Sequence, residues 1–183
     1  MKAHSINTDN ASVKNKLKLR KEAVKNLKEL KVLDLYAGKN VLWNHFDKAR
    51  YFGIEKEKGK GRNLYGDNIK VIPSLDLSDF NVIDCDSYGI PVQVIDELYK
   101  NPTLKKGTII IYTAIGNSMS SLSITLLEKY NMRKMFRKCE SLLSNKSHEL
   151  FYGFLYDLGV RQVREYQEES KSFVKRYGYF IVK

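Results

Sequence analysis

The chain has 183 residues, of which 43% are hydrophobic, and this is enough for one domain with a real core. Its 32 basic and 21 acidic residues give a formal net charge of +11, which favours a polyanionic partner such as nucleic acid, although a merely soluble basic surface is the alternative. Two cysteines cannot form a zinc site. No apolar run reaches the roughly 18 residues of a membrane helix, and the first ten residues, MKAHSINTDN, lack the apolar segment of a signal peptide. We therefore expect a cytoplasmic protein with reduced thiols, no metal and no membrane contact.

A basic amphipathic segment opens the chain, and we assign residues 1–30 to a helical extension. Over residues 11–31, apolar side chains recur near the helical period and basic side chains fill the other faces. The segment is either an ordinary surface helix or a helix that contacts phosphates. For the second case, the candidate nucleic-acid contacts are Lys14, Lys16, Lys18, Arg20 and Lys21.

Residues 31–183 are predicted to form one α/β domain with a doubly wound, mostly parallel sheet. Five apolar runs rich in Val, Ile and Tyr are typical of strands buried on both faces: 32–38, 49–55, 63–67, 80–86 and 107–113. Helices are predicted at 92–101 and 121–143, and residues 163–170 and 172–183 predict a C-terminal pair of antiparallel strands. The second helix carries further candidate nucleic-acid contacts, namely Arg133, Lys134, Arg137 and Lys138.

Acidic or small residues follow the predicted strands, where open α/β sheets bind their ligands. Gly38 follows the first strand and lets a ligand approach the backbone. Glu55 lies about 20 residues beyond Asp34, the distance at which an acid can accept hydrogen bonds from a ribose. Asp84 and Asp86 lie at the end of the fourth predicted strand. Structural alternatives exist for each acid: a helix cap, a bond to loop amides, or a charged turn.

The order of these motifs resembles the class I S-adenosylmethionine-dependent methyltransferases over roughly residues 30–183. KVLDLYAGKN is similar to their first motif, YFGIEKE to the second, LYGDN to the third and VIDCDSYG to the fourth, and the terminal strand pair resembles their antiparallel hairpin. The resemblance implies S-adenosylmethionine as cofactor, with Glu55 at the ribose, Asp67 and Asn68 at the adenine, and Asp84 near the methionine end. The candidate cofactor-binding residues are Asp34, Tyr36, Ala37, Gly38, Glu55, Lys56, Asp67, Asn68 and Asp84.

Within that family, DCDSYGIP resembles the D-x-D-P-F-G-x-P segment of the tRNA guanine-N2 dimethyltransferases and is a variant of the D-P-P-Y motif of amino-group methyltransferases. The resemblance implies two candidate catalytic residues: Asp86, which would accept a hydrogen bond from an exocyclic amine, and Tyr88, which would stack on the base. It implies methyl transfer to a nucleobase amino group, in RNA (tRNA or rRNA guanine) more than in DNA, with a protein partner as one means of substrate recognition.

Two other functions stay open on the sequence. Ser87 stands where the related segments have proline, which supports a non-catalytic nucleic-acid-binding module as an alternative. A dehydrogenase is disfavoured because no G-x-G-x-x-G loop is present to bind a pyrophosphate. Cys85 alternates with the two acids, so we expect its side chain on the opposite face of the strand, in the core.

Overall fold

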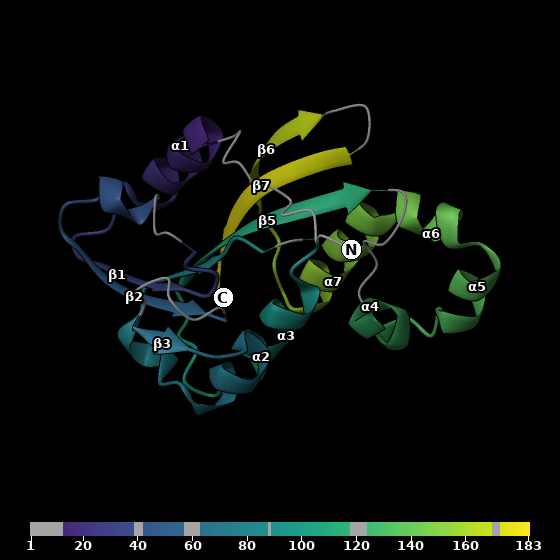
Figure 1. Cartoon of the computed structure of the whole chain (residues 1–183), viewed down its shortest axis with the longest axis horizontal. Coiled ribbons are helices and arrows are strands. Elements are labelled where there is room, and N and C mark those ends of the chain that lie inside the picture. The colour runs from purple at the N-terminus through teal and green to yellow at the C-terminus, as the bar shows by residue number, and fades with distance from the viewer. Residues whose placement is uncertain (1–12, 39–41, 57–62, 88, 118–123, 170–172) are drawn as a thin grey trace, which may run out of the picture.

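A seven-stranded sheet is the frame of the described chain, with strand order β3-β2-β1-β4-β5-β7-β6 (Figure 1). The computed structural model describes residues 13–38, 42–56, 63–87, 89–117, 124–169 and 173–183. Strands β1 to β5 pair in parallel, whereas β7 runs antiparallel to β5 and β6. The strands are β1 (Leu30–Asp34), β2 (Ala49–Glu55), β3 (Leu64–Tyr65), β4 (Val82–Cys85), β5 (Ile109–Asn117), β6 (Arg164–Glu169) and β7 (Phe173–Ile181). The predicted fold class is confirmed.

Helices cover both faces of this sheet. They are α1 (Val13–Val24), α2 (Asn68–Val71), α3 (Val92–Lys100), α4 (Ile124–Lys129), α5 (Arg133–Lys138), α6 (Glu140–Asn145) and α7 (Ser147–Asp157). Three 3₁₀ turns lie at Trp43–His45, Ile72–Ser74 and Leu77–Asp79. No helix in the described segments is both long and apolar enough to cross a membrane.

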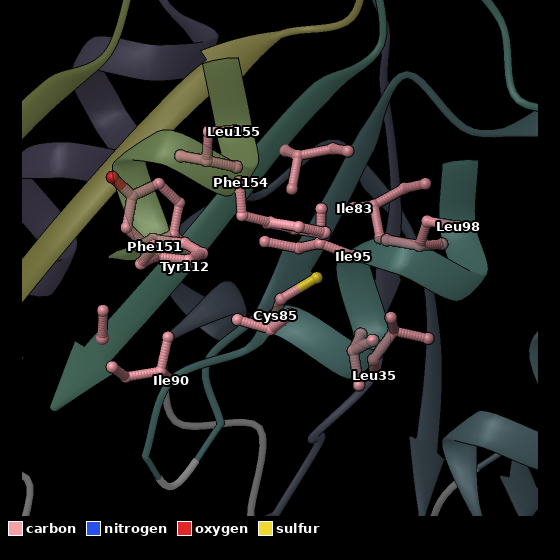
Figure 2. Packing of buried hydrophobic residues seen from close by; sticks show 14 of the residues in the cluster. Leu35, Ile83, Cys85, Ile90, Ile95, Leu98, Tyr112, Phe151, Phe154 and Leu155 are labelled. Carbon is pink, nitrogen blue, oxygen red and sulfur yellow. The ribbon is translucent and has the colours of Figure 1, made fainter. Parts of the chain in front are cut away.

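The larger core lies between one face of the sheet and helices α3 and α7. Alternate strand residues such as Ile83 and Cys85 are fully buried there, beside Ile95 of α3 and Phe154 of α7 (Figure 2). The thiol of Cys85 lies inside this cluster, as its alternation with the neighbouring acids predicted.

The opposite face of the sheet is covered by α1. Leu19 and Ala23 of this helix are buried against strand residues including Val82 and Ile111, with Trp43 in the same cluster. Parallel strands are usually joined through an α-helix, but the described part of the β1–β2 connection holds only the 3₁₀ turn at Trp43–His45. The N-terminal helix therefore supplies the apolar cover for the strands that end in acids.

The region after β5 differs from its prediction as one helix over 121–143. Its described part forms three short helices, α4, α5 and α6. Asn131 lies between the first two with a φ of +53°, in the left-handed region that asparagine tolerates and that ends a helix. Helix α7 was not predicted, although its buried Phe151, Phe154 and Leu155 have the i, i+3, i+4 spacing of an amphipathic helix.

Candidate functional site

The backbone after β1 is tied to the end of β2. The amide of Ala37 donates to the carbonyl of Ile54 over 3.0 Å, and the amide of Gly38 donates to Glu55 Oε2 over 2.8 Å. Gly38 has a φ of +48°, a conformation that glycine adopts without strain. A Cβ on Gly53 would lie 2.9 Å from Cβ of Ala37, so this glycine permits the close approach of the two segments. Three of the candidate cofactor residues, Ala37, Gly38 and Glu55, are thus brought together.

The end of β3 joins the same group. The amide of Gly66 donates to the carbonyl of Glu55 over 3.1 Å, which places Asp67 and Asn68 beside the β2 end. Asp67 caps α2 by accepting from the amide of Ile69, and Lys56 Nζ lies 3.5 Å from its other oxygen. The side-chain amide of Asn68 donates to the carbonyl of Leu35. The buried Oδ1 of Asn68 has no hydrogen-bond partner among the described residues.

Asp34 is a buried acid at the end of β1. Its Oδ1 accepts from the amide of Tyr36 and its Oδ2 from the hydroxyl of Tyr51, both over 3.0 Å. Tyr36 itself is 36% exposed. Burial and the charge of Asp84, which lies opposite in the parallel register, raise the pKa of Asp34 from 3.8 to about 8. Asp34 is therefore mostly protonated at neutral pH.

Asp84 forms a buried ion pair with Arg20 of α1. Arg20 Nε and Nη2 donate to Asp84 Oδ2 over 2.9 and 2.6 Å, and Trp43 Nε1 donates to the same oxygen over 2.7 Å. Both side chains are almost completely buried, at 2% and 1% exposure. Burial raises the pKa of Asp84, and the guanidinium of Arg20 opposes this rise. The guanidinium therefore stabilises the ionised form of a carboxyl group that burial disfavours.

Asp86 accepts hydrogen bonds on both oxygens. Lys16 Nζ lies 2.9 Å from Oδ1 and 2.6 Å from Oδ2, Thr113 Oγ1 donates to Oδ1 over 2.6 Å, and Arg20 Nη2 lies 3.4 Å from Oδ2. Burial opposes ionisation, but the charges of Lys16 and Arg20 outweigh it and hold the pKa of Asp86 below its usual value. We call Asp34, Asp84 and Asp86 the acidic cluster; Lys16 and Arg20 are its two cations from α1.

The structure separates the predicted nucleic-acid contacts into two groups. Arg20 is 1% exposed and paired with acids, so the expectation that it contacts nucleic acid is corrected: its charge is used inside the molecule. Lys16 is also turned inward, with a side chain 16% exposed. The other candidates are exposed, namely Lys14, Lys18 and Lys21 on α1 and Arg133, Lys134, Arg137 and Lys138 on α5. Tyr88 lies outside the described residues.

Sequence reasoning did not connect α1 to the strand-end acids. The available signal was the i, i+4 spacing of Lys16 and Arg20, which puts both cations on the helix face that also carries Leu19 and Ala23. Thr113 was missed because nothing in the apolar run of β5 distinguishes a hydroxyl that faces an acid. The described residues include no group of three or more His, Cys, Asp or Glu side chains arranged to hold a metal ion.

No protein-family model and no curated protein matches the sequence. Solved structures do match. An S-adenosylmethionine-dependent methyltransferase from Archaeoglobus fulgidus is 13% identical with a TM-score of 0.56, over 91% of this chain and 92% of that chain. The Mtq2–Trm112 complex of E. cuniculi, responsible for methylation of the eRF1 translation termination factor, gives 12% identity and a TM-score of 0.58, over 93% and 94%. The chain has the class I methyltransferase fold.

Proteins that share the class I methyltransferase fold with this chain act on different substrates. A precorrin-6y C5,15-methyltransferase from Geobacter metallireducens GS-15 is 14% identical with a TM-score of 0.51, over 99% of this chain and 92% of that chain. Its substrate class differs from the protein substrate of the E. cuniculi complex. The class I methyltransferase fold therefore does not determine the acceptor, which depends on the residues at the site.

Proposed function

We propose that the chain binds S-adenosylmethionine and transfers a methyl group to an amino nitrogen of a nucleobase, in RNA in preference to DNA. One observation carries this proposal: the contact between Gly38 and Glu55 lies at the same edge of the sheet as Asp84 and Asp86. This edge is formed by the carboxyl ends of β1, β2 and β4. In open α/β sheets this edge binds the ligand. The class I methyltransferase fold makes S-adenosylmethionine the ligand to test first.

The residues at this edge fit the cofactor. Glu55 would accept hydrogen bonds from the ribose, and Asp67 with Asn68 would hold the adenine. The buried Oδ1 of Asn68 and Oγ of Ser87 have no hydrogen-bond partner within the described residues, and both can pair with polar groups of a ligand. When bound, S-adenosylmethionine supplies an electrophilic methyl group.

Asp86 is assigned to the acceptor amine. Its ionised carboxylate accepts hydrogen bonds and donates none, so it can orient an amine by its N–H bond and stabilise positive charge that develops on the nitrogen. In the proposed transfer, the acceptor nitrogen would form a bond to the methyl carbon as the bond from that carbon to the sulfonium sulfur breaks, and the proton that the nitrogen then loses would pass to water. We further propose that Tyr88 stacks on the base; aromatic stacking contributes about 1–3 kcal/mol per base.

Recognition of RNA is assigned to the exposed basic residues of α1 and α5. Arg133 and Lys134 begin α5, Arg137 and Lys138 end it, and this helix lies away from the sheet at one end of the molecule (Figure 1). Such residues neutralise phosphates without reading sequence. A protein partner is a second source of recognition, since one methyltransferase of the same fold was solved in complex with Trm112.

A thermal-unfolding titration tests the cofactor. S-adenosylmethionine or S-adenosylhomocysteine at about 100 times its dissociation constant should add about 2.7 kcal/mol and raise the midpoint by about 5–10 °C, whereas NAD should not. Glu55→Ala should remove most of this shift. Glu29→Ala, which removes an exposed carboxylate, is the matched control and should retain the shift. Transfer of a tritiated methyl group to total RNA, with DNA in parallel, then tests the acceptor.

A second candidate function is a nucleic-acid-binding module that retains the fold without catalysis. The observation that favours it is the complete engagement of Asp86 by Lys16, Arg20 and Thr113. For such a module, RNA should bind through the exposed cations and no acceptor should gain a methyl group. Methyl incorporation into total RNA that is lost in Asp86→Asn would exclude this candidate.

A further inference from the structure

Lys16 donates hydrogen bonds to Asp86, the carboxylate that would bind the acceptor amine in the proposed function. We propose that Lys16 is a specificity-determining residue whose ammonium holds Asp86 until a substrate amine displaces it. This inference rests on the proposed function, because it concerns the same site. The inference predicts which kind of substrate group can bind to Asp86: a group that donates an N–H to a carboxylate, as the exocyclic amines of adenine, guanine and cytosine do.

The hydrogen-bond capacity of Asp86 supports a displacement. A carboxylate offers about four acceptor positions on its two oxygens. At Oδ1, Lys16 donates over 2.9 Å and Thr113 over 2.6 Å; at Oδ2, Lys16 donates over 2.6 Å and Arg20 lies at 3.4 Å. These four contacts fill the carboxylate, so a substrate amine can bond to Asp86 only if one of the present donors leaves.

Lys16 is the donor that can leave at least cost. Arg20 is 2% exposed on its side chain and makes two hydrogen bonds to Asp84, and Thr113 is 3% exposed within β5. Lys16 is 16% exposed and lies one helical turn closer to the N-terminus of α1. Its long side chain carries a compact, easily hydrated ammonium on four rotatable carbons, whereas neither other donor has access to solvent.

The site remains suited to an amine after Lys16 has left. Arg20 and Thr113 still contact Asp86, so a positive charge and a hydroxyl continue to favour its ionised form. Displacement of an ammonium requires a competing donor, and a carbonyl oxygen or other pure acceptor cannot compete for a carboxylate. Asp86 therefore selects donors over acceptor-only groups on the same base, and Lys16 sets how strongly a donor must bind to reach the carboxylate.

The experiment replaces Lys16 with two residues that have opposite effects on the contact with Asp86. Lys16→Met keeps the length and removes the competing donor, so the KM for total RNA in the tritiated-methyl assay should fall by about five-fold, the factor that corresponds to about 1 kcal/mol for a partly exposed pair. Lys16→Arg offers a planar, bidentate donor to the carboxylate and should raise the KM. Affinity for S-adenosylmethionine should change in neither variant, and thermal midpoints verify that both are folded.

Lys18→Met is the matched control on the same helix, because Lys18 is exposed and stacks its ammonium over Tyr166 instead of contacting an acid. It should raise the KM for RNA slightly through loss of one phosphate contact.

A KM that rises in both Lys16 variants, or changes in neither, would overturn the inference while leaving the proposed function intact. Absence of methyl transfer by both the wild type and Lys16→Met would overturn the proposed function, and this inference with it; transfer by Lys16→Met alone would support displacement as the limiting step.

Discussion

Arg20 shows how a single charge can be structural even on a helix rich in lysine. Its guanidinium is surrounded by Asp84, Asp86 and the indole of Trp43, at a depth where an unpaired charge is very unfavourable. Although burial opposes its charge, the attraction of Asp84 and Asp86 outweighs burial and raises the pKa of Arg20. The charge of Arg20 and the ionised forms of Asp84 and Asp86 therefore stabilise one another inside the protein.

Removal of Arg20 should strongly destabilise the protein. In Arg20→Ala the ionised Asp84 loses its buried partner, and loss of one member of such a pair costs about 3–5 kcal/mol of unfolding free energy. Lys21→Ala, at the next and exposed position, should change the unfolding free energy by less than about 0.5 kcal/mol. Urea unfolding followed by circular dichroism measures both. Equal stability of the two variants would show that Arg20 is not the partner on which Asp84 depends.

Asp34 should make stability fall as the pH rises. Its pKa is raised from 3.8 to about 8 in the folded state, so between these values the folded protein binds more protons than the unfolded chain. The stabilising contribution is fully present below about pH 4 and is lost as the pH rises through about 8. In Asp34→Asn, Oδ1 can still accept from the amide of Tyr36 and Nδ2 can donate to the hydroxyl of Tyr51, but the side chain does not titrate.

The measurement is the thermal midpoint of the wild type and of Asp34→Asn between pH 5 and 8.5. The midpoint of the wild type should fall relative to that of the variant over this range, because the variant keeps a neutral side chain beside Asp84. Groups distant from Asp34 titrate alike in both proteins, so the difference between the two curves reports the titration of Asp34 together with its effect on Asp84. Parallel curves would mean that Asp34 is ionised in the folded state.

At the scale of the elements, the antiparallel pairing of β5 with β7 joins the C-terminal strand pair to the parallel strands. Tyr112 of β5 lies opposite Gly178 of β7, and its hydroxyl donates to Glu165 of β6. A Cβ on Gly178 would lie 2.5 Å from the buried ring of Tyr112 and 2.8 Å from the side chain of Glu165. The absence of a side chain at Gly178 is therefore what allows a large ring to lie across the strand.

Gly178→Ala should destabilise the protein by about 1–3 kcal/mol, the usual cost of overpacking a core. Gly153→Ala is the control: its Cβ would make only an ordinary contact with the hydroxyl of Tyr130 at 3.5 Å, in the middle of α7. That substitution should stabilise the helix by about 0.5–1 kcal/mol. Chemical denaturation of the two variants should give changes of opposite sign; no destabilisation in Gly178→Ala would show that Tyr112 repacks freely.

The elements also show which parts of the fold could be predicted from the sequence. Strands β1, β2, β4 and β5 were predicted because their apolar runs leave a local signal, and the acids at the ends of β1, β2 and β4 located the edge of the sheet where the site lies. The breaks around Asn131 were not predicted because apolar spacing continues across them. The pairing of Lys16 and Arg20 with Asp86 and Asp84 joins residues more than 60 positions apart, so it depends on how α1 packs and leaves almost no local signal.

At the scale of the whole molecule, the basic residues that give the net charge of +11 differ in their surroundings. Lys16 and Arg20 pair with acids inside the molecule, so their charges are neutralised there. The exposed helix α5 carries Arg133, Lys134, Arg137 and Lys138 within six residues, and no acid lies within the helix. In the proposed function these side chains release counterions from RNA when they bind its phosphates, and the affinity should then depend steeply on salt.

Replacement of all four basic residues of α5 by glutamine should therefore reduce the salt dependence of RNA binding. Each phosphate contact contributes about 0.7 to the slope of log K against log salt concentration on a single strand, so the slope should fall by up to about 3. A control variant removes the same number of charges elsewhere, at the exposed Lys48, Lys70, Lys105 and Lys106. Fluorescence anisotropy of a labelled RNA at several salt concentrations measures the slopes. If both variants lose the same slope, RNA responds to the net charge of the molecule and α5 is not a binding surface; if only the α5 variant does, the helix makes the contacts.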